Sequence, residues 1–254
     1  MIGDSLSNDV PDPRIHFFGE TGLLVQFDEI QTASAIDAVI ALNQRLLDLN
    51  LRGIESMTPS YVSLLIIYDP GVLPGKQLAF TTTKLLKSLP AQLTPKSQYL
   101  QNTSWRLPAL FVGADDEDAM ALQDELRISW SDIIMTFCEA SYRVNALGFL
   151  PGFTYLGGLP AQLHCRRLQT PRVRIPASSV AIAGQQAGIY PMDSPGGWRV
   201  LGRLPFPIFD QRHPSPALFS PNDRIAFIPV SESQFKGLKR AADEGELSLD
   251  SFKQ

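Results

Sequence analysis

The sequence predicts an α+β N-terminal domain followed by a mainly β barrel domain. Between residues 32 and 89, apolar residues recur at helical spacing in two stretches, each preceded by short strand-like segments. Further along, nine of the 18 glycines lie between Gly148 and Gly202, and 12 of the 20 prolines lie between Pro151 and Pro229. Both residue types are unfavourable inside helices, so this second part is expected to consist of strands and loops.

The N-terminal domain is expected over residues 14–100, after a disordered segment over residues 1–13. The hydrophobic pattern predicts strands at 15–18 and 23–27, a helix capped by Thr32 or Ser34 and ending near 49, strands at 54–57 and 61–68, and a helix at 77–89. This order is typical of one sheet with helices on one face. The polar residues 90–103 are expected to link the two domains.

The barrel domain is expected over residues 101–231, followed by a charged C-terminal tail over residues 232–254. The predicted elements are a strand at 105–112, helices at 116–126 and 132–140, and short strands at 173–175, 180–183, 198–202 and 225–229. Short strands separated by glycine and proline turns fit a small closed barrel. The acidic run DDED at 115–118 predicts a solvated helix start, and Ser129 with Asp132 has capping-box spacing.

The composition excludes several classes of function. The net charge of -4 gives no support to nucleic-acid binding, and the longest apolar run, VSLLIIY at 62–68, is too short to span a membrane. Two cysteines and an acidic, polar first segment without an apolar core predict reduced thiols, no signal peptide and a cytoplasmic location.

The sequence does not support a phosphate-binding loop, a metal site or a nucleophile elbow. GVLPGK at 71–76 is one residue shorter than a phosphate loop and has Gln77 where the magnesium-binding hydroxyl belongs, so we expect a turn before a helix. No metal site is expected, because the adjacent His164 and Cys165 diverge in a strand and lack a second ligand pair. No nucleophile elbow is present, and the sequence identifies no general acid or base.

Two segments predict a binding site: LGFLPGFTYLGGLP at 147–160 and TPRVRIPASSVAIAGQQAGIYPMDSPGGWRVLGR at 170–203. Their glycines allow close backbone approach, and their tyrosines and tryptophan combine apolar bodies with polar tips. Arg172 and Arg174 would share one strand face and could clamp a carboxylate or phosphate. Each aromatic residue, taken alone, could equally serve to pack the core, and the two arginines could equally lie on a solvent-exposed strand face. The candidate substrate-binding residues are Phe149, Pro151, Gly152, Tyr155, Arg172, Arg174, Ser179, Gly184, Gln186, Tyr190, Pro195, Gly196, Gly197 and Trp198.

At these residues the sequence resembles the KipI-like family, also described as allophanate hydrolase subunit 1 or as the B subunit of 5-oxoprolinase. GFLPGFTYLGGLP, PASSVAIAGQQAGIYP and SPGGWRVLGR are similar to three of its long motifs, and GETGLLVQF at 19–27 is similar to a looser N-terminal element. The resemblance covers nearly the whole chain. It implies that the second domain is a cyclophilin-like β-barrel.

The resemblance also implies a partnership. Family members work with a KipA-like C subunit together with a LamB/YcsF-like A subunit to open 5-oxo-L-proline, a small carboxylate, to L-glutamate with the use of ATP. Backbone amides near Gly184 and Gly196-Gly197 would then be candidates for stabilising oxyanion charge. Two alternatives stay open: a regulator that inhibits a sensor histidine kinase, and a divergent carboxyltransferase subunit. The chain differs from the family pattern at Phe137, Thr154, Ser178, Ala187 and Leu204, where histidine, proline, glycine, threonine and threonine are usual.

Overall fold

The computed structural model describes residues 13–27, 33–90 and 102–254. The chain divides into two compact units, residues 1–101 and residues 102–254, which we call the N-terminal unit and the barrel unit and describe separately. The predicted disordered segment 1–13, the predicted cap at Thr32 and the predicted linker 90–103 fall wholly or mainly outside the described residues.

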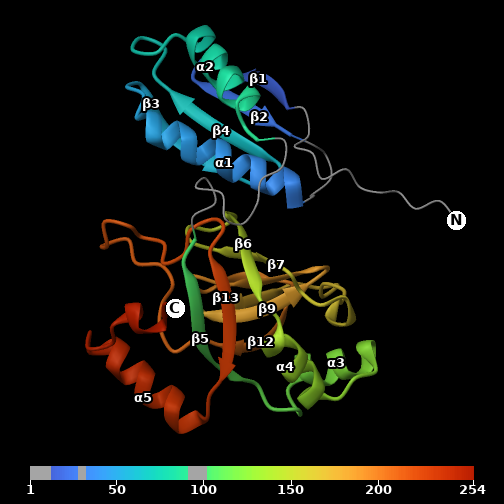
Figure 1. The fold of residues 1–254 in the computed structure, drawn as a ribbon. Helices are drawn as coiled ribbons and strands as arrows, with labels where there is room; N and C mark the ends of the chain where they lie inside the picture. The colour runs from blue at the N-terminus through green and yellow to red at the C-terminus, as the bar shows by residue number, and fades with distance from the viewer. Residues whose placement is uncertain (1–12, 28–32, 91–101) are drawn as a thin grey trace, which may run out of the picture. The chain divides into compact units, whose positions relative to one another are not determined.

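The N-terminal unit is an antiparallel sheet with helices. Its elements are β1 (Arg14–Phe18), β2 (Gly22–Gln26), α1 (Ala33–Leu49), β3 (Ile54–Pro59), β4 (Ser63–Tyr68) and α2 (Gly75–Lys87). The strands pair in the order β1-β2-β4-β3. This confirms the predicted order of strands and helices, and residues 71–74 form the expected turn before α2 (Figure 1).

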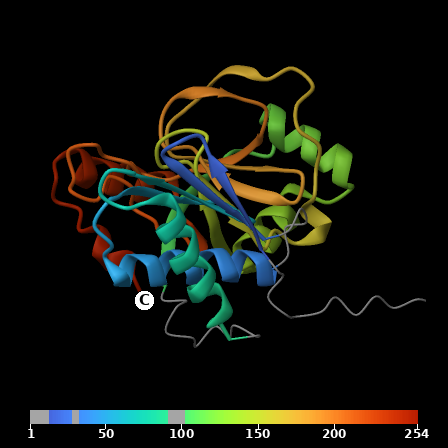
Figure 2. The same ribbon diagram turned by 90° about the horizontal axis from the view of Figure 1, so that it is seen from above.

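The alternation of apolar residues explains how this sheet is covered. Along β4, Leu64, Ile66 and Tyr68 are buried while their neighbours are only half-buried, because successive strand residues point to opposite faces. The buried face packs with apolar residues of both helices in one core. Figures 1 and 2 show α1 and α2 on the same side of the sheet, as the sequence predicted.

The barrel unit contains a closed barrel of seven strands, ordered β10-β7-β6-β13-β5-β12-β9, and a separate pair formed by β8 and β11. This confirms the predicted barrel. The elements are β5 (Ser104–Phe111), α3 (Glu117–Leu126), α4 (Trp130–Glu139), β6 (Tyr142–Leu147), β7 (Thr154–Gly157), β8 (Arg172–Ile175), β9 (Ser179–Ala183), β10 (Gln186–Ile189), β11 (Ser194–Gly196), β12 (Arg199–Arg203), β13 (Arg224–Pro229), α5 (Glu232–Asp243) and short 3-10 helices at Ala161–Leu163 and Leu249–Phe252.

The barrel interior is a continuous apolar core. In β9, Val180 and Ile182 belong to this core, whereas Ala181 and Ala183 belong to a separate cluster outside it. Three of the five positions that depart from the family pattern, Phe137, Ala187 and Leu204, also pack in the core. Because these side chains fill the interior, their identity affects packing there.

Another departure, Ser178, has a left-handed backbone with φ 64°. This conformation costs a non-glycine residue about 1–2 kcal/mol. The Ser178 hydroxyl donates a hydrogen bond of 2.8 Å to the Phe206 carbonyl, and its N–H donates one of 2.7 Å to the Tyr190 carbonyl. A buried hydrogen bond contributes a similar amount, so the serine is accommodated where glycine is usual.

The segment after residue 231 is part of the barrel unit. Ser231 and Gln234 form a capping box at the start of α5, which has no buried residue. Beyond it, Phe252 stacks on Phe206 with ring centroids 5.1 Å apart, and the Gln254 N–H donates to the Ser104 carbonyl. The predicted charged tail therefore consists of an exposed helix and a final segment that packs against the barrel.

Candidate functional site

Four of the predicted site residues meet around one ring. Phe153 is 2 % exposed and contacts Phe149, Tyr155, Tyr190 and Trp198, with ring centroids 6.0, 4.7, 4.9 and 5.6 Å away respectively. Tyr155 also contacts Trp198 edge to face at 6.0 Å. We call these five residues the aromatic cluster. Most of these ring pairs meet edge to face, an arrangement favoured by the ring quadrupoles.

Small residues on the outer face of the barrel make room for the aromatic cluster. Cross-strand pairing places Val200, Ala181, Gly188 and Tyr155 in one row across β12, β9, β10 and β7. Gly188 is decisive, since a Cβ there would lie 2.9 Å from Trp198 Cζ3 and 3.1 Å from Phe153 Cζ. The two rings therefore rest directly on the β10 backbone.

The exposed edge of the cluster comes from the 147–160 segment. Phe149 has φ 69° and is 73 % exposed, although its ring touches the buried Phe153. Gly152 has φ 80°, and a Cβ there would lie 2.7 Å from a ring carbon of Phe209. A loop with two left-handed residues is thus held in place and presents an aromatic ring to solvent, a feature that marks candidate binding surfaces.

The two arginines predicted as an anion clamp are already paired with carboxylates. Arg172 Nη2 donates to Asp118 Oδ1 over 2.8 Å, and Arg174 Nε donates to Asp193 Oδ2 over 2.7 Å. The Ala177 N–H and Arg174 hold the pKa of the Asp193 carboxyl below its ordinary value. An incoming anion would therefore have to displace or share a carboxylate at either arginine.

Asp118 corrects the prediction that the DDED run is solvated. Only the preceding residues are exposed, and Asp116 caps α3 as an acidic helix start should. The Asp118 side chain is 3 % exposed; its Oδ2 accepts the Val200 N–H at 2.8 Å, and its Oδ1 lies 3.6 Å from Arg199 Nη1 in addition to Arg172. One buried carboxylate thus joins α3 to β8 and β12.

Arg167 is a site residue that the sequence pattern did not single out. Its guanidinium carbon lies 5.7 Å above the centroid of the Trp198 ring, within the range of a cation–π contact. Burial raises the pKa of Tyr190 to about 12 and raises that of Tyr155, while Arg167 acts in the opposite direction on both hydroxyls. Both phenols therefore stay protonated at neutral pH and lie within the electrostatic reach of Arg167.

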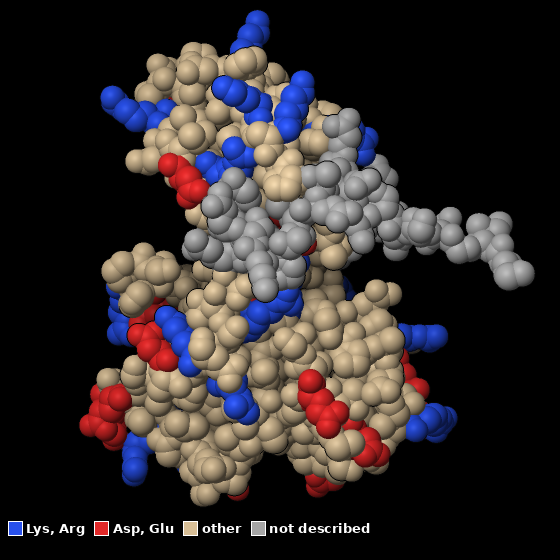
Figure 3. Space-filling view, in the orientation of Figure 1, with Lys and Arg blue, Asp and Glu red and all other residues tan. Residues whose placement is uncertain are grey.

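The other predicted site residues have mixed surroundings. Ser179 is buried in β9, Gln186 is half-buried at the start of β10, and Pro151 and Pro195 are exposed. The Gly184 N–H donates to the Cys165 carbonyl over 2.7 Å. It is therefore occupied, which argues against its predicted use for an oxyanion. On the barrel-unit face in Figure 3, acidic and basic side chains are interspersed, and no large patch of one charge forms there.

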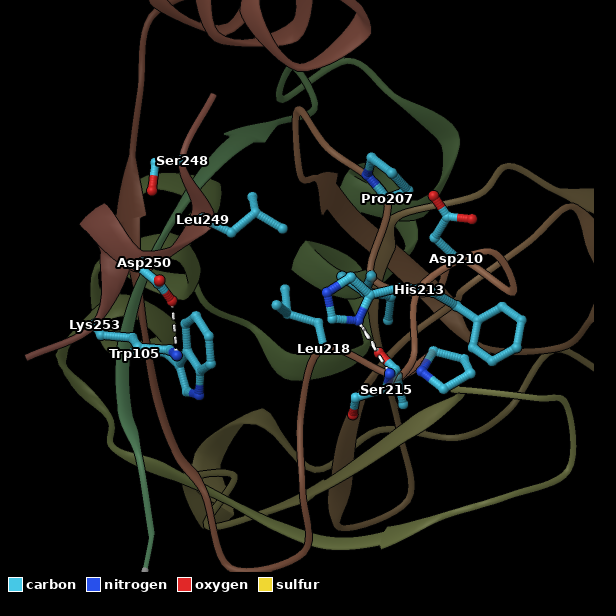
Figure 4. Close-up of a pocket in the computed structure, with 14 residues that line it drawn as sticks. Trp105, Pro207, Asp210, His213, Ser215, Leu218, Ser248, Leu249, Asp250 and Lys253 are labelled. Carbon is cyan, nitrogen blue, oxygen red and sulfur yellow. Dashed lines mark hydrogen bonds and ion pairs between the residues drawn. The ribbon is translucent and has the colours of Figure 1, made fainter. Parts of the chain in front are cut away.

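A separate cavity of about 470 Å³ lies between the 207–218 loop and the end of the chain (Figure 4). Trp105, Leu218 and Leu249 form apolar walls, and His213 points into the space between them. Lys253 lies 5.1 Å over the Trp105 ring and pairs with Asp250 at 2.7 Å. The predicted site residues do not line this cavity, but its wall residue Phe209 packs on Gly152.

An apolar groove of about 690 Å³ lies between α4 and β13 and contains Cys138. Burial raises the pKa of Cys138 to about 11 and that of the buried Cys165 to about 12. Neither thiol is an activated nucleophile, because the reactive thiolate forms only at strongly alkaline pH.

We expect Cys138 to react slowly with iodoacetamide in the folded chain. A thiol pKa of about 11 leaves roughly a hundredfold less thiolate at pH 8 than an ordinary cysteine has. Mass spectrometry of the alkylated chain should show the rate at Cys138 still rising about tenfold per pH unit between pH 8 and 10. The same chain in urea is the control, and a rate that levels off near pH 9 in the folded state would contradict the prediction.

In the described part of the chain, no three histidine, cysteine, aspartate or glutamate side chains are grouped so as to hold a metal ion. Likewise, none of the helices within residues 13–27, 33–90 and 102–254 has the length and apolar character needed to cross a bilayer.

Fold and site together define a class of protein: a sheet-and-helix unit followed by a seven-stranded barrel. The outer face of the barrel carries the aromatic cluster, with Arg167 over its Trp198 ring. The chain belongs to the family described as carboxyltransferase domain, subdomain C and D, which it matches over residues 13–219.

Its relatives support this placement. The chain is homologous to the B subunit of 5-oxoprolinase from Escherichia coli O157:H7, with 30 % identity over 222 residues, 86 % of this chain and 97 % of that protein. The B subunit of 5-oxoprolinase from Bacillus subtilis (strain 168) is 26 % identical over 91 % of this chain and 98 % of that protein. The crystal structure of TTHA0988 superimposes with a TM-score of 0.71 and 33 % identity over 83 % of this chain, which spans only 40 % of that longer chain.

Proposed function

We propose that this chain is the B subunit of an ATP-dependent 5-oxoprolinase-type complex. The supporting observation is homology to a 5-oxoprolinase B subunit that runs through 86 % of this chain and 97 % of the relative. The complex would hydrolyse the lactam C–N bond of 5-oxo-L-proline to give L-glutamate, with the use of ATP. Its other members would be a KipA-like C subunit together with a LamB/YcsF-like A subunit, and the chain alone would be inactive.

The aromatic cluster is the proposed contribution of this chain to substrate binding. Substrate sites combine apolar walls with a few fixed polar groups, and this surface offers the half-buried Tyr155 and the buried Trp198 beside Arg167. The candidate substrate-binding residues of the two glycine-rich segments remain proposals. No residue of this chain is assigned as the general acid or base, so the chemical step belongs to the assembled complex.

Coexpression of the chain with candidate A and C subunits tests the proposal. The purified complex should hydrolyse ATP only when 5-oxo-L-proline is present and should release L-glutamate in equal amount. Each subunit omitted in turn is the control, and each omission should abolish turnover. An intact complex of all three subunits without oxoproline-dependent turnover would rule this function out.

The family description itself supports one second candidate, a carboxyltransferase subunit. The same complex should then transfer a carboxyl group from a biotinylated carrier protein, because this chain has no lysine in a biotin-carrier motif. Carboxyl transfer without oxoproline hydrolysis would favour that candidate over the 5-oxoprolinase function.

A further inference from the structure

The backbone on both sides of Arg167 is fixed to the barrel unit. Cys165 and Gly184 exchange backbone hydrogen bonds of 3.3 and 2.7 Å, and the Leu168 N–H donates to the Gly197 carbonyl over 2.8 Å. The Arg166 N–H donates to Glu125 Oε1 over 2.8 Å. These contacts hold the 165–168 segment against Gly184 and Gly197, two of the predicted site residues. The backbone of Arg167 therefore has a fixed position beside Trp198.

The ring beneath Arg167 is equally constrained. Trp198 is 6 % exposed and is held at its edges by Phe153 and Tyr155. Arg167 itself is exposed. Across residues 13–27, 33–90 and 102–254 it forms no ion pair and no hydrogen bond, and its side chain contacts the Trp198 ring. A guanidinium that lies over a ring and makes no such hydrogen bond keeps its N–H donors available for a planar anion.

Neighbouring groups favour a carboxylate over a more highly charged anion. The half-buried Tyr155 adds a phenolic hydroxyl to the same surface, whereas Arg172 and Arg174 are each paired with a carboxylate, Asp118 and Asp193 respectively. The guanidinium held over the Trp198 ring matches the single charge and two oxygens of a carboxylate. The adjacent rings of Tyr155 and Phe149 offer an apolar surface for a compact ring or chain on the ligand.

We propose that Arg167, which lies over Trp198 and beside Tyr155, binds the carboxylate of a small cyclic or short-chain carboxylic acid. The proposal rests on the function proposed above and names the group that recognises the substrate class. Arg167 is thus a binding residue that determines specificity, while Trp198 and the anchored 165–168 segment position it. Arg172 and Arg174 serve the structure around it.

The test uses the full chain and two probes, 5-oxo-L-proline and its uncharged amide, titrated by calorimetry. The wild-type chain should prefer the carboxylate to the amide. Arg167→Gln should weaken binding of 5-oxo-L-proline roughly 10- to 100-fold and should leave binding of the amide unchanged, so that the preference disappears. Arg167→Lys, which keeps the charge but not the paired donors, should give an intermediate loss.

Arg166→Gln is the matched control: Arg166 anchors the segment only through its backbone N–H, and its exposed side chain, which carries the same charge, contacts no ring in the described chain. It should leave both affinities unchanged. Equal losses in the two variants, no loss in either, or no saturable binding of the probes to the wild-type chain, alone or in the complex, would overturn the proposal.

The outcome is separable from that of the proposed function. A complex that turns over 5-oxo-L-proline with the same KM in the Arg167→Gln variant keeps the function and overturns the carboxylate site. A chain that loses carboxylate binding on Arg167→Gln, within a complex that does not turn over 5-oxo-L-proline, keeps the site and overturns the function.

Discussion

Asp118→Asn should lower the free energy of unfolding of the barrel unit by about 2–4 kcal/mol, because breaking a buried ion pair leaves an uncompensated charge. Asp118 is 3 % exposed and serves Arg172, Arg199 and the Val200 N–H. Asparagine has the same shape, but it lacks the charge, and its amide would turn N–H donors toward other donors. Arg172 is 28 % exposed, which keeps the expected loss below that of a fully buried pair.

Urea unfolding followed by tryptophan fluorescence measures this loss in the right unit, since Trp105, Trp130 and Trp198 all lie in the barrel unit. Asp124→Asn is the matched control on the same helix: Asp124 pairs with Arg127 at 2.6 Å, but the two side chains are 77 % and 80 % exposed. That change should cost less than about 1 kcal/mol. Equal unfolding midpoints for the two variants would show that the Asp118 network does not stabilise the barrel.

Local sequence patterns predicted the elements whose stability is mostly local. The helical apolar spacing of α1 and the capping serine of α4, Ser129, are visible within a few residues of sequence. By contrast, β7 was not predicted, because Thr154–Gly157 lies among glycines and prolines and has no alternating pattern of its own. It is a strand because β6 and β10 supply its hydrogen bonds on both sides, and such partners cannot be read from a short window.

The site shows the same limit. Aromatic and glycine content drew attention to the residues that form the aromatic cluster, and Phe149, Tyr155, Tyr190 and Trp198 do meet. The sequence predicted the roles of the charged residues less well. Arg172 and Asp118 are 54 positions apart, so neither the neutralised arginine nor the buried acid could be recognised from local spacing. Arg167 is distinguished from its neighbour Arg166 by the ring beneath it, which belongs to a distant segment.

Gly188→Val should destabilise the barrel unit by about 1–3 kcal/mol, as expected when extra carbon atoms are forced into a packed site. The first added carbon would lie 2.9 Å from Trp198, 3.1 Å from Phe153 and 3.1 Å from the Thr154 carbonyl oxygen. The carbonyl is backbone and cannot rotate away, so the rings must move. Valine is otherwise favoured over glycine in a strand, and a loss of stability would therefore show that the clash dominates intrinsic propensity.

Gly148→Val separates this effect from the general effect of losing a glycine. Gly148 lies in the loop before the cluster and its φ is not positive. Nothing lies within 4 Å of the place that a Cβ would take, so the free energy of unfolding of the Gly148→Val variant should differ from that of the wild type by less than about 0.5 kcal/mol. Gly188→Val should also shift tryptophan emission in the folded state and abolish the preference for 5-oxo-L-proline over its amide, because Trp198 supports Arg167. If the Gly188→Val variant kept its stability but lost ligand binding, the aromatic cluster would contribute to recognition and not to stability. Retained binding would mean that the Trp198 ring position does not matter to the site.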